Sequence, residues 1–302
     1  MRESRFLIDL RLLRLILSHS LHLFGRVFRF RSKTGADQHG RRCFTVGVLA
    51  LVAIQTGCAL APKDIGRPAV TKVTPFSAAL PGGPFPGGWQ ELRFSKFRTP
   101  TLFELFNDGG TTVVRATSEN SSSALVESID VDPLEYPVLH WRWKAPRLVP
   151  GANTTRRKAE DAPVRLIVAF AGDKQKLSFA DQMTFAETRA LLGLDPPYAT
   201  LEYVWGDGAA KESIVQNGWN ARIRLLLVES GAKRLGKWIL ESRNVVEDFR
   251  RAFGEEPGRI TSIGIHCDSD ATESRSEGYF GDIEFLRREE ADRATNLRPT
   301  GR

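Results

Sequence analysis

The sequence predicts a mainly β fold, a jelly-roll-like antiparallel β-sandwich with one or two short helices. Many short segments alternate apolar and polar residues with a period of two, and Pro or Gly turn signals separate them. The composition also changes at Trp89, because all six Trp lie between Trp89 and Trp238. We therefore expect one β-sandwich domain over residues 89–286.

The segment 138–143 shows the alternation most clearly. Leu139, Trp141 and Trp143 fall on one side of an extended chain, while His140 and Arg142 fall on the other. The same reasoning predicts further strands at 111–117, 124–131, 164–170, 201–205, 221–228, 238–240, 260–267 and 279–285.

Two helices are expected between these strands. Asn244 and Glu247 have the spacing of a capping box, and the apolar side chains of Val245 and Phe249 then share a helical face until Gly254. A second helix is predicted over 179–192.

The net charge of +7 is confined to the N-terminus. Residues 1–42 hold ten basic and three acidic residues, so the rest of the chain, with 33 of each, is neutral. A neutral domain lacks the basic footprint of a nucleic-acid-binding protein, so we expect no nucleic-acid partner.

The basic segment precedes an apolar run, FTVGVLALVAI at 44–54, which is too short to span a bilayer of about 30 Å but suits an export signal. The run ends in Gln55-Thr56-Gly57-Cys58, which resembles the bacterial lipidation signal. Residues 1–58 are therefore interpreted as an N-terminal extension plus a lipoprotein-type signal peptide, with an ordinary cleaved signal as the alternative. Lipid on Cys58 would anchor the protein at the periplasmic face of the bacterial cell envelope. Ala59 favours the outer membrane.

Residues outside the sandwich have a different composition. The segment 59–88 holds six Pro and five Gly, which indicates a flexible tether, and the charged tail 287–302 is expected to be disordered. Cys267 is the one cysteine left after Cys58, so no disulfide framework is predicted, and its apolar surroundings predict a buried side chain.

The acidic segment after the strand at 260–267 is a candidate metal site. Asp268 and Asp270, joined by Asp282, offer the hard oxygen ligands that Ca²⁺ prefers. The twelve-residue EF-hand pattern is absent, and Asp in a turn also accepts hydrogen bonds from the local backbone. We therefore expect no obligatory cofactor and keep Ca²⁺ as the alternative.

Candidate ligand-binding residues come from the aromatic set and from charges near strand ends. Trp219 lies between Asn-Gly and Asn, so it is the best candidate for an exposed aromatic that stacks on a sugar ring. The other candidates are Trp205, Tyr203, His140, Arg142, Asp161, Arg165 and Arg243. The charged ones are alternatively ordinary surface pairs. The sequence lacks a Gly-x-Ser-x-Gly elbow, His-Glu-x-x-His and a phosphate-binding loop, so no catalytic residue is assigned.

Several segments together resemble the domain of unknown function 3047 family. They are GW at 88–89, HWRWK at 140–144, EDAPVRLIVAF at 160–170, TLEYVW at 200–205, ESRNVVEDFRRAFGEEP at 241–257, and IGIHCDSDAT with GYFGDIEF within 263–285. The resemblance implies a shared fold and no activity.

Three hypotheses about function follow. The first is a non-enzymatic envelope lipoprotein whose sandwich binds a glycan or another envelope polymer. The second is a carbohydrate-active hydrolase that uses two carboxylates, and a cleft holding two acids would favour it. The third is a structural or assembly lipoprotein with a protein partner, and a large exposed apolar patch would favour it.

Overall fold

The computed structural model describes residues 72–95 and 97–296. They belong to one compact unit, Asp64–Arg302. The predicted signal peptide, Cys58 and residues 59–71 of the predicted tether lie outside the described residues. Among the described residues, no helix is both long enough and apolar enough to cross a membrane.

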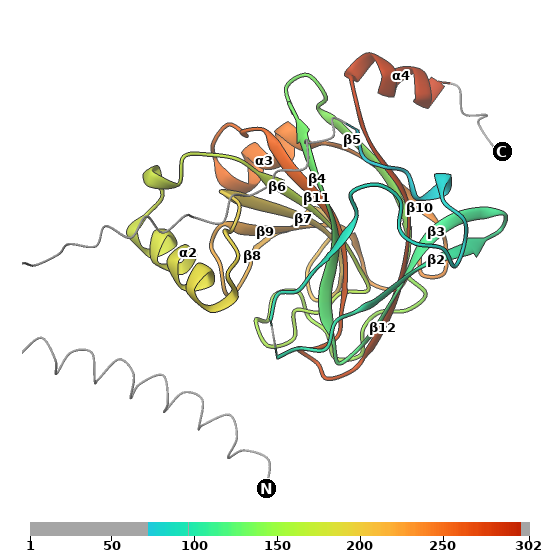
Figure 1. The fold of residues 1–302 in the computed structure, drawn as a ribbon, viewed down its shortest axis with the longest axis horizontal. Helices are drawn as coiled ribbons and strands as arrows, with labels where there is room; N and C mark the ends of the chain where they lie inside the picture. The colour runs from blue at the N-terminus through green and yellow to red at the C-terminus, as the bar shows by residue number, and fades with distance from the viewer. Residues whose placement is uncertain (1–71, 96, 297–302) are drawn as a thin grey trace, which may run out of the picture. The chain divides into compact units, whose positions relative to one another are not determined.

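In the described part of the chain, twelve strands form two sheets (Figure 1). The seven-stranded sheet has the order β1 (Gln90–Leu92), β4 (Ser122–Val131), β11 (Ile260–Asp268), β6 (Val164–Phe170), β7 (Ala199–Gly206), β9 (Ile223–Ser230), β8 (Ile214–Gln216). The five-stranded sheet has the order β10 (Ile239–Asn244), β5 (Val138–Lys144), β12 (Arg275–Leu286), β3 (Thr111–Glu119), β2 (Leu102–Asp108). The predicted mainly-β sandwich is confirmed. All strand pairs are antiparallel except β7 with β9.

The hydrophobic core lies between the two sheets. Trp141 and Trp143 of β5 point inward with ring centroids 5.3 Å apart, and Trp141 also packs on Tyr203 of β7 at 5.0 Å. Cys267 is fully buried in the same core, as predicted. The aromatic rings provide much of the apolar area that this core removes from water.

β6 is buried along its whole length, which decides where the polar site lies. Every second residue from Val164 to Phe170 joins the inter-sheet core. Because side chains alternate across a strand, Arg165, Ile167 and Ala169 point to the outward face of the seven-stranded sheet, yet they too are buried. The outward face of this sheet is therefore covered at β6, and a charged side chain, Arg165, lies beneath the cover.

Both predicted helices are present, and local signals define their ends. In α3 (Val245–Phe253), Asn244 Oδ1 accepts hydrogen bonds from the backbone N–H of Val246 and Glu247, and Gly254 closes the helix at φ 72°. In α2 (Phe179–Leu192), Ser178 accepts from the N–H of Asp181, and Gly193 ends the helix at φ 69°. A left-handed residue at this position favours glycine. A one-turn 3₁₀ helix, η2 (Lys174–Lys176), precedes α2.

The end of the predicted tether is part of the folded domain. Residues 72–88 pack against the sandwich. Val73 and Phe76 lie in the core, and Phe76 begins the short helix η1 (Phe76–Ala78). The buried carboxylate of Glu127 accepts from the backbone N–H of Thr74 at 2.8 Å and from its hydroxyl at 2.5 Å. The segment was expected to be flexible up to residue 88, but residues 72–88 are ordered. The Pro and Gly content predicted flexibility, and it gives no information about these buried contacts.

The tail also differs from expectation. Helix α4 (Arg288–Asn296) lies within the segment expected to be disordered (Figure 1). The Glu290 side chain accepts a hydrogen bond from the backbone N–H of Arg287, and Ala291 is buried. This carboxylate satisfies an N–H that would otherwise lack a partner at the helix start.

Candidate functional site

Arg165 is the centre of the candidate site, and its side chain is 2% exposed. The guanidinium donates to both carboxylate oxygens of Asp268 and to Glu202 Oε2, each at 3.2 Å. It also donates to the backbone oxygen of Glu160 and lies 3.6 Å from that residue's Oε1. One buried cation thus joins β6, β7, β11 and the loop before β6.

Strand register brings these residues together. Arg165 lies opposite His266 of β11 and opposite Val204 of β7. Asp268 and Glu202 are each two residues away from those positions, so they share the outward face with Arg165. The predicted ligand-binding residues Asp161 and Arg165 are therefore buried parts of a network, at 1% and 2% exposure.

Carboxyl groups outnumber cationic groups in this cluster. The carboxyl groups are those of Glu160, Asp161, Glu202, Asp268 and Asp270. Burial raises the pKa of each above its ordinary value, and for Glu202 the pKa reaches about 7. Burial alone would lower the pKa of Arg165, but Asp268 and the other carboxylates outweigh it and raise that pKa. The guanidinium therefore stays charged.

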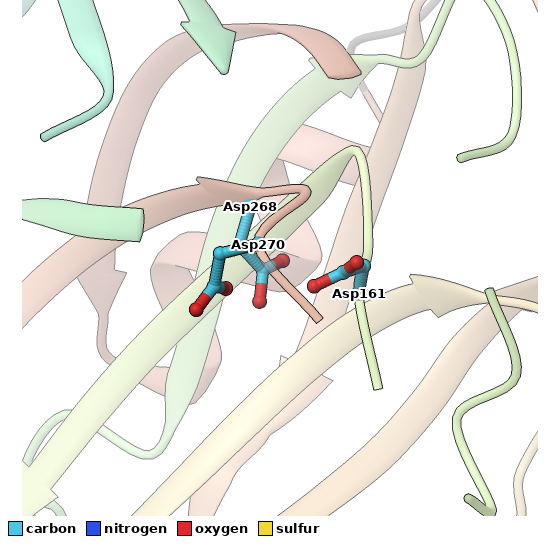
Figure 2. A group of neighbouring side chains, drawn as sticks. All are labelled: Asp161, Asp268 and Asp270. Atoms are coloured by element: carbon cyan, nitrogen blue, oxygen red, sulfur yellow. The ribbon is translucent and has the colours of Figure 1, made fainter. Parts of the chain in front are cut away.

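Three of these carboxylates, from Asp161, Asp268 and Asp270, lie within 4.8 Å of one another (Figure 2). Asp161 comes from the loop before β6, and the other two come from the end of β11 and the turn after it. The predicted metal set is thus brought together only in part, because Asp282 lies elsewhere and accepts hydrogen bonds from Ser77.

The donor set of this trio is suited to a hard cation, but its oxygens already have partners. Asp161 accepts from the backbone N–H of Ala271 at 3.2 Å, and from the N–H and hydroxyl of Thr272 at 2.7 and 2.6 Å. Asp268 accepts from Arg165 and from the N–H of Ala162. These bonds hold the turn after β11 against the loop before β6.

His266 completes the inner part of the site. Its Nε2 lies 3.2 Å from the Ser122 hydroxyl and its ring packs edge-on against Phe94 at 5.1 Å. Its Nδ1 is buried without a hydrogen-bond partner among the described residues. Burial, and then the charge of Arg165, lower the pKa of His266 well below its ordinary value, so the ring is neutral.

A chain of hydrogen bonds leads from the buried cluster to the surface. Glu160 Oε1 accepts from Asn217 Nδ2 at 2.9 Å. Asn217 Oδ1 in turn accepts from the backbone N–H of Trp219 and Asn220, at 2.9 and 3.0 Å. This side chain therefore fixes the turn between β8 and β9.

Trp219 stands exposed on that turn, with 67% of its surface accessible, as the sequence predicted. The guanidinium of Arg157 lies 3.4 Å from the centre of its ring. An indole has two faces, so one face is covered by a cation while much of the side chain remains open to solvent.

The other predicted ligand-binding residues do not gather here. Trp205 and Tyr203 are fully buried between the sheets, so neither reaches a ligand from solvent. Tyr203 donates to Asp248 at 3.1 Å, and Arg243 pairs with the same carboxylate at 2.7 Å. Arg243 thus ties β10 to α3 rather than lining the site.

His140 and Arg142 belong to the opposite side of the sandwich. By alternation along β5 they face outward from the five-stranded sheet, where the Arg142 guanidinium lies 4.7 Å from the Trp238 ring centre. The predicted set therefore divides between two faces of the molecule.

Sequence reasoning missed Glu160, Asn217 and Arg157. Glu160 and Asn217 were each part of a segment already considered and Arg157 was not, but the roles of all three depend on contacts over 57 or more residues, as for Glu160 with Asn217. No local pattern carries that information.

Comparison with known proteins decides the family. The sequence profile of the family described as "Protein of unknown function (DUF3047)" matches residues 87–284. The chain belongs to this family. Membership covers nearly the whole described sandwich, and the family description assigns no activity.

The comparison with curated proteins finds no match. Among solved structures, the chain is similar to the crystal structure of the Emp47p carbohydrate recognition domain, with 9% sequence identity and a TM-score of 0.36. The similarity covers 72% of this chain and 95% of that chain.

Proposed function

We propose that this domain binds a glycan or another envelope polymer without catalysing a reaction, and that Trp219 is the contact residue. The single observation that carries this is a large aromatic side chain, 67% exposed, on a turn fixed to a buried network. Exposure of an indole costs free energy, so a fixed and exposed indole favours a binding role. Its flat apolar face suits the ring of a sugar.

The buried cluster supports the proposal by positioning the contact residue. Arg165 holds Glu160, Glu160 holds Asn217, and Asn217 fixes the backbone of the turn. A preorganised contact residue loses less conformational entropy on binding.

The test is affinity electrophoresis of the full-length protein, in a non-ionic detergent, through gels that contain envelope and plant polysaccharides. We expect at least one polysaccharide to retard the protein, and Trp219→Ala to abolish the retardation. Trp238→Ala is the matched control, because it removes an indole from the opposite sheet. Equal retardation of the wild type and Trp219→Ala would contradict the proposal.

We further propose an envelope location, anchored by lipid on Cys58. The support is the sequence: an apolar run of eleven residues ending four residues before the cysteine. In a bacterial host, Cys58→Ser should move the protein from the membrane fraction to the soluble fraction or block its processing. Unchanged membrane association of this variant would contradict the anchor.

A carboxylate-dependent hydrolase is the second candidate function. Glu160 and Glu202 lie 3.6 and 3.2 Å from the same nitrogen of Arg165, and burial raises the pKa of both, which is a property of general acids. The Arg165 guanidinium lies between the two carboxylates and forms an ion pair with each. This favours a structural role for both carboxylates, and therefore the binding proposal. Release of reducing ends from a bound polysaccharide, lost in Glu202→Gln, would establish the hydrolase instead.

Calcium at Asp161, Asp268 and Asp270 is an alternative that the same experiment tests. The three carboxylates form a hard-oxygen donor set, although most of their oxygens already accept hydrogen bonds. Retardation that EDTA abolishes and Ca²⁺ restores would establish a metal in the binding face. We expect retardation to be unchanged by EDTA.

A protein partner is the third candidate. Its support is α2, on which Phe179 and Met183 are exposed at the i, i+4 spacing that places them on one helical face. Absence of retardation by every polysaccharide would favour this candidate.

A further inference from the structure

The loop beside Trp219 carries three consecutive cations, Arg156, Arg157 and Lys158. All three are exposed, and none forms an ion pair with another described residue. Arg259, Arg275 and Arg287 are different, since each pairs with a carboxylate. The positive charge next to Trp219 is therefore available to an outside partner.

This loop is held in place. The Asn153 N–H donates to the backbone oxygen of Ala159 at 2.7 Å, and Asn153 Oδ1 accepts from the N–H and hydroxyl of Thr155. The Thr154 N–H donates to the backbone oxygen of Asp207, after β7, at 2.9 Å. The three cations therefore lie on an anchored segment.

The contact between the loop and the Trp219 turn requires glycine. A Cβ atom at Gly218 would lie 2.5 Å from Arg157 Cγ, so the stem of Arg157 packs directly on the Gly218 backbone. This packing sets the guanidinium 3.4 Å from the centre of the indole ring. An aromatic surface and a cation are thereby presented together.

We propose that the ligand at Trp219 is an acidic polysaccharide, whose sugar ring stacks on the indole and whose carboxylates meet Arg156, Arg157 and Lys158. This rests on the proposed function and adds the charge of the ligand. Arginine suits carboxylates because its planar fork donates two parallel hydrogen bonds.

Single-stranded nucleic acid also combines stacking with negative charge, but the charge distribution favours the polysaccharide. Beyond residue 42, basic and acidic residues are equal in number, at 33 each. A nucleic-acid groove follows a phosphate backbone over many nucleotides and needs a broad basic surface, whereas one cluster of three cations matches a few charged sugars.

The experiment compares polymers that differ only in charge. The full-length protein in a non-ionic detergent is titrated with polygalacturonate and alginate, and with the same polymers after methyl esterification of their carboxyl groups. At low salt we expect each acidic form that binds to do so at least about fivefold more tightly than its ester, and salt to reduce the difference. Poly-dT is included and is expected to bind at least about tenfold more weakly.

Two variants with equal changes in charge locate the effect. Arg156→Gln/Arg157→Gln/Lys158→Gln should remove the preference for the acidic form and leave binding to the ester. Lys233→Gln/Lys237→Gln/Arg288→Gln is the control, because these cations are exposed and form no ion pair among the described residues. Trp219 precedes β9, whereas Lys233 and Lys237 follow its other end and Arg288 begins α4. The control should keep the preference.

Equal affinity for acidic and esterified polymers overturns the inference and leaves the proposed function intact. Equal or tighter binding of poly-dT overturns it in favour of nucleic acid. Binding to no acidic polymer also overturns it. In that case retention by a neutral polysaccharide, lost in Trp219→Ala, still upholds the proposed function, and no retention by any polysaccharide overturns both.

Discussion

At the residue scale, Arg165 connects more of the molecule than any other candidate that the sequence singled out for ligand contact. It was predicted as a charge near the start of a strand, either lining a cleft or pairing at the surface. The structure buries it among carboxylates from β7, β11 and a loop. The contribution of such a buried charge to stability is tested most directly by removing one partner of the ion pair.

Arg165→Met should therefore destabilise the domain strongly. Removing the cation leaves several carboxyl groups buried without it, and loss of one partner in a buried ion pair costs about 3–5 kcal/mol. Urea unfolding at pH 7 measures the change. Arg259→Met, whose side chain is half exposed, should change the free energy of unfolding by less than about 1 kcal/mol. Equal effects of the two variants would contradict a central role for Arg165.

Glu241 provides a test of pH dependence away from the site. It is 8% exposed, and burial, with Glu229 close by, raises its pKa from 4.5 to about 7 against the opposing effect of Lys211, Arg234 and Arg243. The folded state thus holds this proton more tightly than the unfolded state. Its contribution to stability is present below pH 4.5 and is lost as the pH rises to about 7.

Glu241→Gln removes that titration. We expect the variant and the wild type to have similar stability near pH 4.5, and the variant to gain up to roughly 3 kcal/mol by pH 8, at about 1.4 kcal/mol for each unit of pKa. Urea unfolding across this range measures the difference. A difference that is constant with pH would show that Glu241 has an ordinary pKa.

At the element scale, local sequence signals predicted the helices correctly. Order that depends on long-range packing was not predicted. The helix after Asn244 was predicted because Asn244 and Glu247 have the spacing of a capping box and Gly254 follows, all within a few residues, whereas the Ser178 cap of α2 was found only in the structure. The segment before Trp89 was expected to be flexible because Pro and Gly dominate it. Its order comes from Phe76 in the core and from Glu127, 53 residues from Thr74.

Phe76→Ala should accordingly destabilise the sandwich by about 3–5 kcal/mol, the cost of removing a buried phenylalanine from a core. Thermal unfolding of the variant measures it. Leu80→Ala in the same segment is the control, and it should be close to neutral because Leu80 is 80% exposed. A neutral Phe76→Ala would mean that this segment does not contribute to the core.

At the scale of the whole molecule, the proposed binding face depends on the register of the seven-stranded sheet. That register sets Asp268 and Glu202 beside Arg165, and the loops that pack over them present Arg157 and Trp219. Polar flanks were enough to predict that Trp219 is exposed. They were not enough to predict its neighbours, because a shift of one residue in strand register would move Arg165, Glu202 and Asp268 to the core face.

The most direct test of binding at Trp219 follows the indole N–H signals of the full-length protein by NMR during titration with a polysaccharide that retards it. Trp89, Trp141, Trp143 and Trp205 are at most 7% exposed, and Trp219 is identified by the signal that Trp219→Phe removes. We predict that the Trp219 signal shifts and saturates while the signals of the four buried indoles stay in place. A saturable shift at Trp238 alone, or binding with an unchanged Trp219 signal, would contradict it and move the binding face to the five-stranded sheet or elsewhere.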